Sequence, residues 1–176
     1  RRPSRQVVIT GLFIAVASFF IEAIGTNTGK IFGVYSYGRT LGPALLNTPV
    51  IIGLNWFLLI YCTNVISRLL WKRLSKGGEG SQEGLPESVF VIITGSLLMV
   101  AYDLFLEPAA MRLDMWSWEC GVIPFRNYVG WFFFSGLFHT VTRFWGEEEP
   151  NMRAVPLFAV QVGFFAAIDI YYFIAA

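Results

Sequence analysis

The sequence predicts an all-α integral membrane protein, a bundle of about five transmembrane helices that forms one domain over residues 1–176. Hydrophobic residues make up 55% of the chain even before its 17 glycines are counted, whereas soluble domains reach about 45–50% with glycine included. Charged residues make up only 14%, against about 25% in soluble domains. Five apolar stretches are each long enough to cross the roughly 30 Å hydrocarbon core of a bilayer.

The five stretches cover residues 7–24, 48–70, 88–106, 127–144 and 154–176. They lack the alternation of apolar and polar residues that strands of an outer-membrane barrel show. If the five helices alternate in direction, nine of the 13 Lys and Arg residues fall on one side and four on the other. Because cytoplasmic loops keep the positive charge, we expect the N-terminus in the cytoplasm of a bacterial or archaeal cell, with the helices in the cytoplasmic membrane.

The connections between the stretches are of two kinds. Residues 72–87 are polar and rich in glycine, which predicts a solvated cytoplasmic linker, and residues 147–150 form a charged turn. The two outer connections, residues 25–47 and 108–126, are aromatic and interrupted by Gly or Pro. We expect these two to be re-entrant or interfacial segments at the same face of the bundle, where protein can satisfy their backbone.

Composition excludes several classes of function. An apolar chain with a net charge of +1 is no ordinary soluble enzyme, disordered chain or nucleic-acid binder. No Lys lies in the five stretches, so a retinal Schiff base is excluded, and the single histidine, His139, excludes bis-histidine haem. We therefore expect no cofactor and no metal. Cys62 and Cys120 lie at different predicted depths, which predicts two free thiols.

Four carboxylates lie in or next to the apolar stretches, and the predicted topology brings all of them to the outer leaflet. They are Glu22, Asp103, Glu107 and Asp169. An ionisable group within a membrane span costs several kcal/mol and is by default a functional candidate. The alternative is that Arg39, Arg112 or Arg126 pairs with them and fixes the outer loops. For Asp169, which lies in no motif, a hydrogen bond at a helix end is a sufficient explanation.

The spacing of Asp103 and Glu107 places both on one helix face, because residues four apart are neighbours on a helix surface. Two close carboxyl groups in a medium of low dielectric do not both ionise easily. We therefore expect one of the two to hold a proton near neutral pH, which is what a general acid requires.

Aromatic residues gather in the sequence beside these carboxylates. They include Tyr35, Tyr37, Trp116, Trp118, Tyr128 and Trp131. Aromatic faces can hold a cationic centre at about 0.5–2 kcal/mol per contact, and they can also line a slot for a flat apolar ligand. The alternative is an ordinary interfacial belt of Trp and Tyr, which is the interpretation we adopt for Trp71 and Trp145 on the other side.

Several motifs follow one another in a characteristic order. Residues 22–29 read EAIGTNTG and residues 31–37 read IFGVYSY; residues 103–110 read DLFLEPAA and are followed by WSW at 116–118, GVIP at 121–124 and NYVGW at 127–131. Between them stand Thr48-Pro49 and Asn55-Trp56. This series resembles the carotenoid biosynthesis membrane proteins, the family that includes the carotenoid 1,2-hydratases and bisanhydrobacterioruberin hydratases.

Two features depart from the family pattern. Cys120 stands just before the Gly-x-x-Pro element, where the family has a tyrosine. Members also usually have more spans, which implies that N-terminal helices of a longer chain precede the numbered sequence.

The resemblance implies addition of water to the terminal carbon–carbon double bond of an acyclic carotenoid or similar polyene that enters from the lipid bilayer. Asp103 or Glu107 would supply the proton with Glu22 as partner, aromatic faces would stabilise the tertiary carbocation, and no cofactor would be needed. The implied substrate-binding residues are Tyr35, Tyr37, Trp116, Trp118, Asn127 and Trp131. Two alternatives stay open: a carotenoid cyclase, which shares the protonation step, and a non-catalytic pigment-binding subunit held in a larger complex by membrane protein partners.

Overall fold

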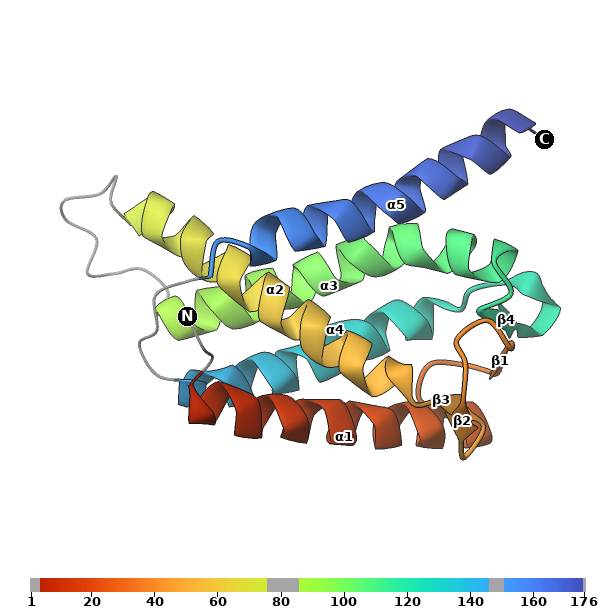
Figure 1. Cartoon of the computed structure of the whole chain (residues 1–176), viewed down its shortest axis with the longest axis horizontal. Coiled ribbons are helices and arrows are strands. Elements are labelled where there is room, and N and C mark those ends of the chain that lie inside the picture. Colours follow the sequence, from red (N-terminus) through yellow and green to blue (C-terminus); the bar gives the residue numbers. More distant parts are fainter. Residues whose placement is uncertain (1–3, 76–85, 146–150, 176) are drawn as a thin grey trace.

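The computed structural model describes residues 4–75, 86–145 and 151–175, and helices account for most of them (Figure 1). The α-helices are α1 (Arg5–Thr28), α2 (Ile51–Ser75), α3 (Glu87–Arg112), α4 (Phe125–Val141) and α5 (Ala154–Ala175). Two short 3₁₀ helices, η1 (Glu119–Gly121) and η2 (Thr142–Trp145), follow β4 and α4 respectively. The expected linker 72–87 falls partly in α2 and at the start of α3, while its residues 76–85 and the charged turn 147–150 lie outside the described residues.

Four of the helices, α1, α2, α3 and α5, are long and apolar enough to cross a membrane. α4 has 17 residues, which corresponds to about 25 Å, and η2 continues it by four residues. The exposed side chains of α1 include Leu12, Phe13 and Phe20, whereas several polar side chains, among them Ser18 and Asn64, are buried. Apolar residues outside and small polar residues between helices are typical of helix packing in lipid.

Two helices run further than the apolar stretches predict, so both outer connections begin later in the sequence than expected. α1 continues past Ile24 because Asn27 Nδ2 and Thr28 Oγ1 donate back to carbonyl oxygens one turn earlier, at 2.7 and 2.6 Å. It ends at Gly29, whose left-handed φ of 63° suits a residue without a side chain. α3 likewise continues through Pro108 to Arg112.

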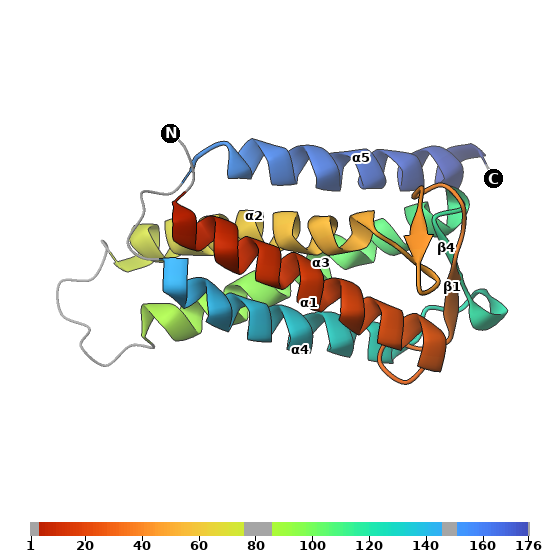
Figure 2. The same cartoon turned by 60° about the horizontal axis from the view of Figure 1, so that its bottom comes forward.

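The bundle is built around α2 and α3, which lie between α5 on one side and α1 and α4 on the other (Figure 2). α3 packs against α2, α4 and α5, and α1 packs against α2. α5 contributes only Ala154 to the buried residues. The core therefore lies among the first four helices, with α5 attached along one face.

Short strands join the two outer connections at one end of the bundle (Figure 1). β1 (Tyr35–Tyr37) pairs antiparallel with β4 (Trp116–Trp118), and β2 (Ala44–Leu45) pairs with β3 (Thr48–Pro49). Since β1 follows α1 and β4 follows α3, the two connections lie at the same face, as predicted from the charge distribution. They meet as a two-stranded ladder.

The prediction that Trp71 and Trp145 belong to an interfacial belt on the opposite side is wrong for Trp145. Trp145 is buried, its ring packs 5.6 Å from that of Tyr61, and its indole nitrogen donates to Thr10. It connects η2 to α1 and α2 instead of lying in a lipid interface. The prediction of two free thiols is confirmed, since Cys62 is buried and Cys120 is exposed.

The close contact of α1 and α2 depends on Gly53. A Cβ atom added there would collide with the carbonyl oxygen of Ala15 and lie 3.1 Å from Phe19 Cβ. Ser18 Oγ donates to the Ala15 carbonyl oxygen at 3.2 Å and lies 3.5 Å from the Gly53 carbonyl oxygen across the same contact. The absence of a side chain at position 53 thus sets the distance between the two helices.

We expect Gly53→Ala to lower the thermal denaturation midpoint of the detergent-solubilised protein, because overpacking costs about 1–3 kcal/mol. Gly163→Ala is the matched control, since a Cβ at this position of α5 would meet nothing within 4 Å. This control should keep or slightly raise the midpoint, because alanine favours a helix over glycine. Equal midpoints for the two variants would contradict the role assigned to Gly53.

Candidate active site

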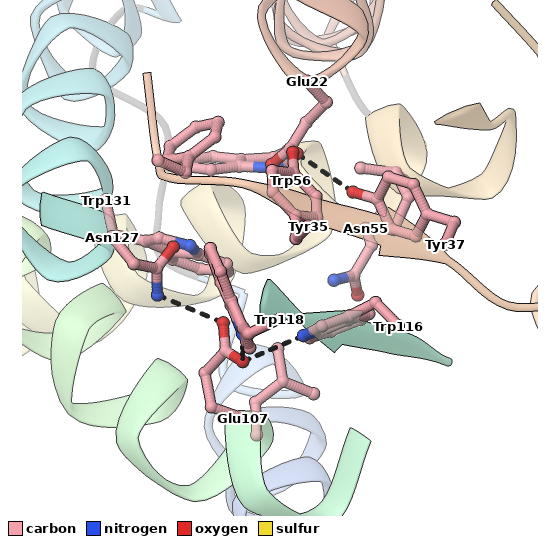
Figure 3. Close-up of a pocket in the computed structure, with 13 residues that line it drawn as sticks. Glu22, Tyr35, Tyr37, Asn55, Trp56, Glu107, Trp116, Trp118, Asn127 and Trp131 are labelled. Carbon is pink, nitrogen blue, oxygen red and sulfur yellow. Dashed lines mark hydrogen bonds between the residues drawn. The ribbon is translucent and has the colours of Figure 1, made fainter. Parts of the chain in front are cut away.

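The first of two carboxylate clusters is centred on Glu22, which α1 places 5% exposed under the strands. Its Oε2 atom accepts hydrogen bonds from the hydroxyls of Tyr35 at 2.6 Å and Tyr37 at 2.9 Å. Its Oε1 atom accepts from the indole nitrogen of Trp56 on α2 at 2.8 Å. Three neutral donors from two other elements therefore surround this carboxylate (Figure 3).

The second cluster is centred on Glu107, which α3 places 2% exposed. Its Oε2 atom accepts from the indole nitrogens of Trp116 at 2.9 Å and Trp118 at 2.6 Å. Its Oε1 atom accepts from the side-chain amide of Asn127 on α4 at 3.1 Å. The two clusters thus follow one plan, in which a strand gives two donors and a helix gives the third.

The ladder of β1 and β4 ties the two clusters together. Tyr35 is paired with Trp118 and Tyr37 with Trp116, with ring centroids 4.9 and 6.0 Å apart. Because side chains alternate along a strand, all four rings lie on one face of the ladder. Ser36, between the two tyrosines, lies on the other face. The Tyr-Ser-Tyr and Trp-Ser-Trp sequences therefore encode a donor-bearing face held against two buried carboxylates.

Asp103 is fully buried one turn from Glu107 on α3. Its Oδ2 atom accepts from the Asn127 amide at 2.7 Å, so the same amide nitrogen bridges the two carboxyl groups. Its Oδ1 atom has no hydrogen-bond partner among the described residues. The expected shared face of α3 is confirmed, and Asp103 is the carboxyl group with the fewest donors.

A small cavity lies between the two clusters, and about 30 Å³ of it can hold the centre of a water molecule. A water molecule therefore fits between the two clusters. Eight of the nine residues that the sequence predicts for catalysis or substrate binding line it: Glu22, Tyr35, Tyr37, Glu107, Trp116, Trp118, Asn127 and Trp131. The ninth, Asp103, does not line the cavity, but it accepts from the same Asn127 amide as Glu107.

Five further residues, which were not among the predicted site residues, also line the cavity. Trp56 and Asn55 on α2 line it, together with Phe32, Ile52 and Leu106. Trp56 is stacked on Trp131 with ring centroids 4.5 Å apart. The Asn55-Trp56 pair in the motif series was a usable signal, but it did not show that the indole would donate to Glu22.

The alternative of arginine pairing is wrong for the three site carboxylates. The ion pairs in the described ranges are Arg68–Glu87 at 3.6 Å and Arg112–Asp169 at 2.9 Å. Arg126 donates instead to the carbonyl oxygen of Gly29 at 2.7 Å, and Arg39 is exposed. The ion pair with Arg112 thus accounts for Asp169. Glu22, Asp103 and Glu107 face no cation among the described residues.

The tyrosine donors are held in their neutral form. Burial and the neighbouring Glu22 raise the pKa of Tyr35 and that of Tyr37 well above the ordinary value. Both hydroxyls therefore stay protonated and keep donating at any physiological pH.

The arrangement has the parts of a general acid–base site in an apolar, aromatic surrounding. Two carboxyl groups four residues apart can share a proton. Glu22 faces one of them, Glu107, across the cavity, and indole and phenol rings form its walls. Such a site can protonate an apolar substrate, stabilise a cation and direct water to it.

Comparison with known proteins assigns the family. The profile of the family described as carotenoid biosynthesis protein matches residues 2–175. Among curated proteins, the chain is similar to bisanhydrobacterioruberin hydratase of Haloarcula japonica, with 31% identity over 130 residues. The alignment covers 72% of this chain and 41% of that relative, so the chain spans about two fifths of the relative's length. No solved structure matches the chain significantly.

The chain therefore belongs to the carotenoid biosynthesis protein family. Membership confirms the resemblance seen in the motif series and supports a carotenoid-modifying role in a membrane context.

The raised pKa values of Tyr35 and Tyr37 predict a loss of stability in alkali. Between pH 10 and their higher folded-state pKa, the unfolded chain releases protons that the folded chain keeps, so the free energy of unfolding falls as pH rises. Each tyrosine contributes up to about 1.4 kcal/mol per pH unit there and nothing below that range. Denaturation of the detergent-solubilised protein from about pH 9 to about pH 11 measures the slope.

The double variant Tyr35→Phe/Tyr37→Phe should flatten this alkaline slope, whatever its stability at neutral pH. Ser36→Ala is the matched control, since it changes the same strand on its other face and removes no group that titrates there. A double variant with the wild-type slope would show that these hydroxyls are not shielded as described.

Proposed function

We propose that this chain is an integral membrane enzyme that adds water to the terminal carbon–carbon double bond of an acyclic carotenoid end group. The observation that carries the proposal is the cavity between the Glu22 and Glu107 clusters, which has room for water, is walled by Trp and Tyr and faces no cation among the described residues. Family membership, together with the similarity to a hydratase over part of its length, supports the same reaction.

We propose the following membrane placement. All five helices span the bilayer, with the N-terminus of the numbered chain in the cytoplasm and the β1–β4 ladder at the outer side. Nine Lys and Arg residues then face the cytoplasm. The polyene enters from the lipid, which is the phase in which so long an apolar molecule dissolves.

The first chemical step is protonation of the double bond. A carboxylate that accepts several hydrogen bonds is stabilised as an anion; Glu22 and Glu107 each accept three, whereas Asp103 accepts one. We therefore place the proton of the Asp103–Glu107 pair on Asp103 at rest. The reactive form is the one in which Glu107, which lines the cavity, holds the proton of the pair. Glu107 donates this proton to the less substituted alkene carbon, so that a C–H bond forms and a tertiary carbocation remains.

The second step is capture of the cation by water. The indole and phenol faces around the cavity, with the negative charge of Glu107, stabilise the cation. A water molecule in the cavity forms the new C–O bond, and Glu22 accepts the proton that this water releases. The product is a tertiary alcohol, and the proton on Glu22 returns to the Asp103–Glu107 pair through water in the cavity.

The cavity favours hydration over cyclisation, which begins with the same protonation. A cyclase passes the cation to an internal double bond and gains from excluding water near it. Here carboxylate oxygens and the amide of Asn55 line the space, and these polar groups hold water.

We predict that Glu22→Gln, Asp103→Asn and Glu107→Gln each lower hydration about 10²–10⁴-fold, the range for loss of a general acid or base. Each amide keeps the size of the group and removes its proton chemistry. The measurement is pigment mass after expression in a bacterium that makes an acyclic carotenoid such as lycopene, because hydration adds the mass of one water and cyclisation adds none.

Asp169→Asn is the matched control, since this carboxylate bonds to Arg112 and lies outside the cavity; it should keep hydration. Unchanged pigment with wild-type protein present in the membrane would overturn the proposed function. Normal hydration by both Asp103→Asn and Glu107→Gln would overturn the assigned acid while leaving the reaction intact.

A further inference from the structure

Two polar side chains that line the candidate active site belong to neither carboxylate cluster. They are Asn55 on α2 and Trp131 on α4, and no hydrogen bond joins either one to another lining side chain among the described residues (Figure 3). The other polar lining side chains are all bonded within the two clusters: Glu22, Tyr35, Tyr37, Trp56, Glu107, Trp116, Trp118 and Asn127. Only Asn55 and Trp131 are therefore free to make a first hydrogen bond to a molecule in the cavity.

The two free groups differ in what they offer to water. A water molecule that captures a carbocation needs a free lone pair for the new C–O bond, so its two protons must be taken up by acceptors. The Trp131 indole can only donate, and its hydrogen bond would occupy one of those lone pairs. The Asn55 amide has an oxygen atom that accepts. Asn55 is thus the uncharged side chain of the lining that can hold a water proton without first giving up a partner.

Glu22 can take the other proton of the same water. Its Oε2 atom already accepts from two tyrosine hydroxyls, whereas its Oε1 atom accepts only from the Trp56 indole. A carboxylate oxygen has two acceptor sites, so Oε1 has one left. Asn55 and Glu22 line the same cavity and come from neighbouring helices, α2 and α1 (Figure 3).

Asn55 also stands where water can reach the cavity. Eleven of the 13 lining residues are buried, and only Tyr37 and Asn55 are half-buried. The hydroxyl proton of Tyr37 is already donated to Glu22 at 2.9 Å. An amide without a partner in apolar surroundings costs free energy, and a bound water removes that cost.

We propose that Asn55 selects hydration over return to the alkene by holding the water that captures the cation. The inference rests on the proposed function. One water proton is donated to Asn55 Oδ1 and the other to Glu22 Oε1, which leaves a lone pair to form the C–O bond, and Glu22 then accepts the proton that the water releases. Without this water, the cation gives a proton back to the Glu107 carboxylate from the carbon that Glu107 protonated, and the C–H electron pair restores the double bond.

Reaction in heavy water separates the two fates of the cation. Membranes that contain the protein are incubated in D₂O with an acyclic carotenoid such as lycopene, so that the acids of the site carry deuterons. A captured cation gives a hydrated product. A cation that instead loses the original hydrogen returns as an alkene that carries deuterium. Mass spectrometry of the pigments measures both products.

Asn55→Leu keeps the approximate size of the side chain and removes its acceptor. We expect hydration to fall about tenfold, which corresponds to the loss of one hydrogen bond between neutral groups, while deuterium in the unhydrated carotenoid stays at the wild-type level or rises. Asn55→Asp keeps an acceptor oxygen and should retain most of the hydration. Glu107→Gln should lose both products, because it prevents the first step.

Leu54→Ala is the matched control, since Leu54 precedes Asn55 on α2, is exposed and does not line the cavity; it should match the wild type in both products. Hydration by Asn55→Leu at the level of this control would overturn the inference. An equal loss of hydration and deuterium exchange in Asn55→Leu would overturn it as well, because the residue would then act on protonation or on the fold. Wild-type protein that exchanges deuterium but forms no hydrated carotenoid would overturn the proposed function itself.

Discussion

The structure depends on one constraint, the cost of burying carboxyl groups inside an apolar helix bundle. An ionised carboxylate without partners costs several kcal/mol in such a place, and the chain meets this cost with neutral donors. Glu22 and Glu107 each receive three, and four of those six come from the strands β1 and β4. The strands in turn hold the two outer connections over the helix ends. The same hydrogen bonds that make the carboxylates tolerable therefore fix the loops that close the site.

The choice of neutral donors has a chemical consequence. An arginine beside Glu22 or Glu107 would also satisfy the carboxylate, but it would cancel the negative charge and repel a carbocation. Indole and phenol groups donate one hydrogen bond each, add no charge, and present aromatic faces that attract cations. Arg112 is used elsewhere, on Asp169 and over the ring of Tyr172. The bundle thus separates its cations from the acids of the site.

Much of this site could be predicted from the sequence because ionisable residues are rare within membrane-spanning stretches and are easily recognised there. The apolar stretches set the topology, the basic residues set its direction, and Glu22, Asp103 and Glu107 stood out as acids at one predicted depth. The spacing of Asp103 and Glu107 also fixed their common helix face. What could not be predicted were contacts between distant segments: the pairing of Tyr-Ser-Tyr with Trp-Ser-Trp, and the bond from Trp56 to Glu22. Period-2 alternation over three residues is too short to indicate a strand, and only the register decides which rings face inward.

Asp103 was predicted to lie in the cavity with the other two acids, and its actual position bears on the proposed mechanism. The sequence placed three acids in one cavity, but Asp103 does not line it and is linked to Glu107 through the shared amide of Asn127. Two acids then line the cavity, while the third has one free oxygen atom and a shared donor. In the proposed hydration, Glu107 would deliver the proton because it lines the cavity, whereas Asp103 would act through the pair that it forms with Glu107. Asn127 contacts both acids through one amide nitrogen, so the arrangement of the two carboxyl groups depends on how the last turns of α3 pack against the first turn of α4.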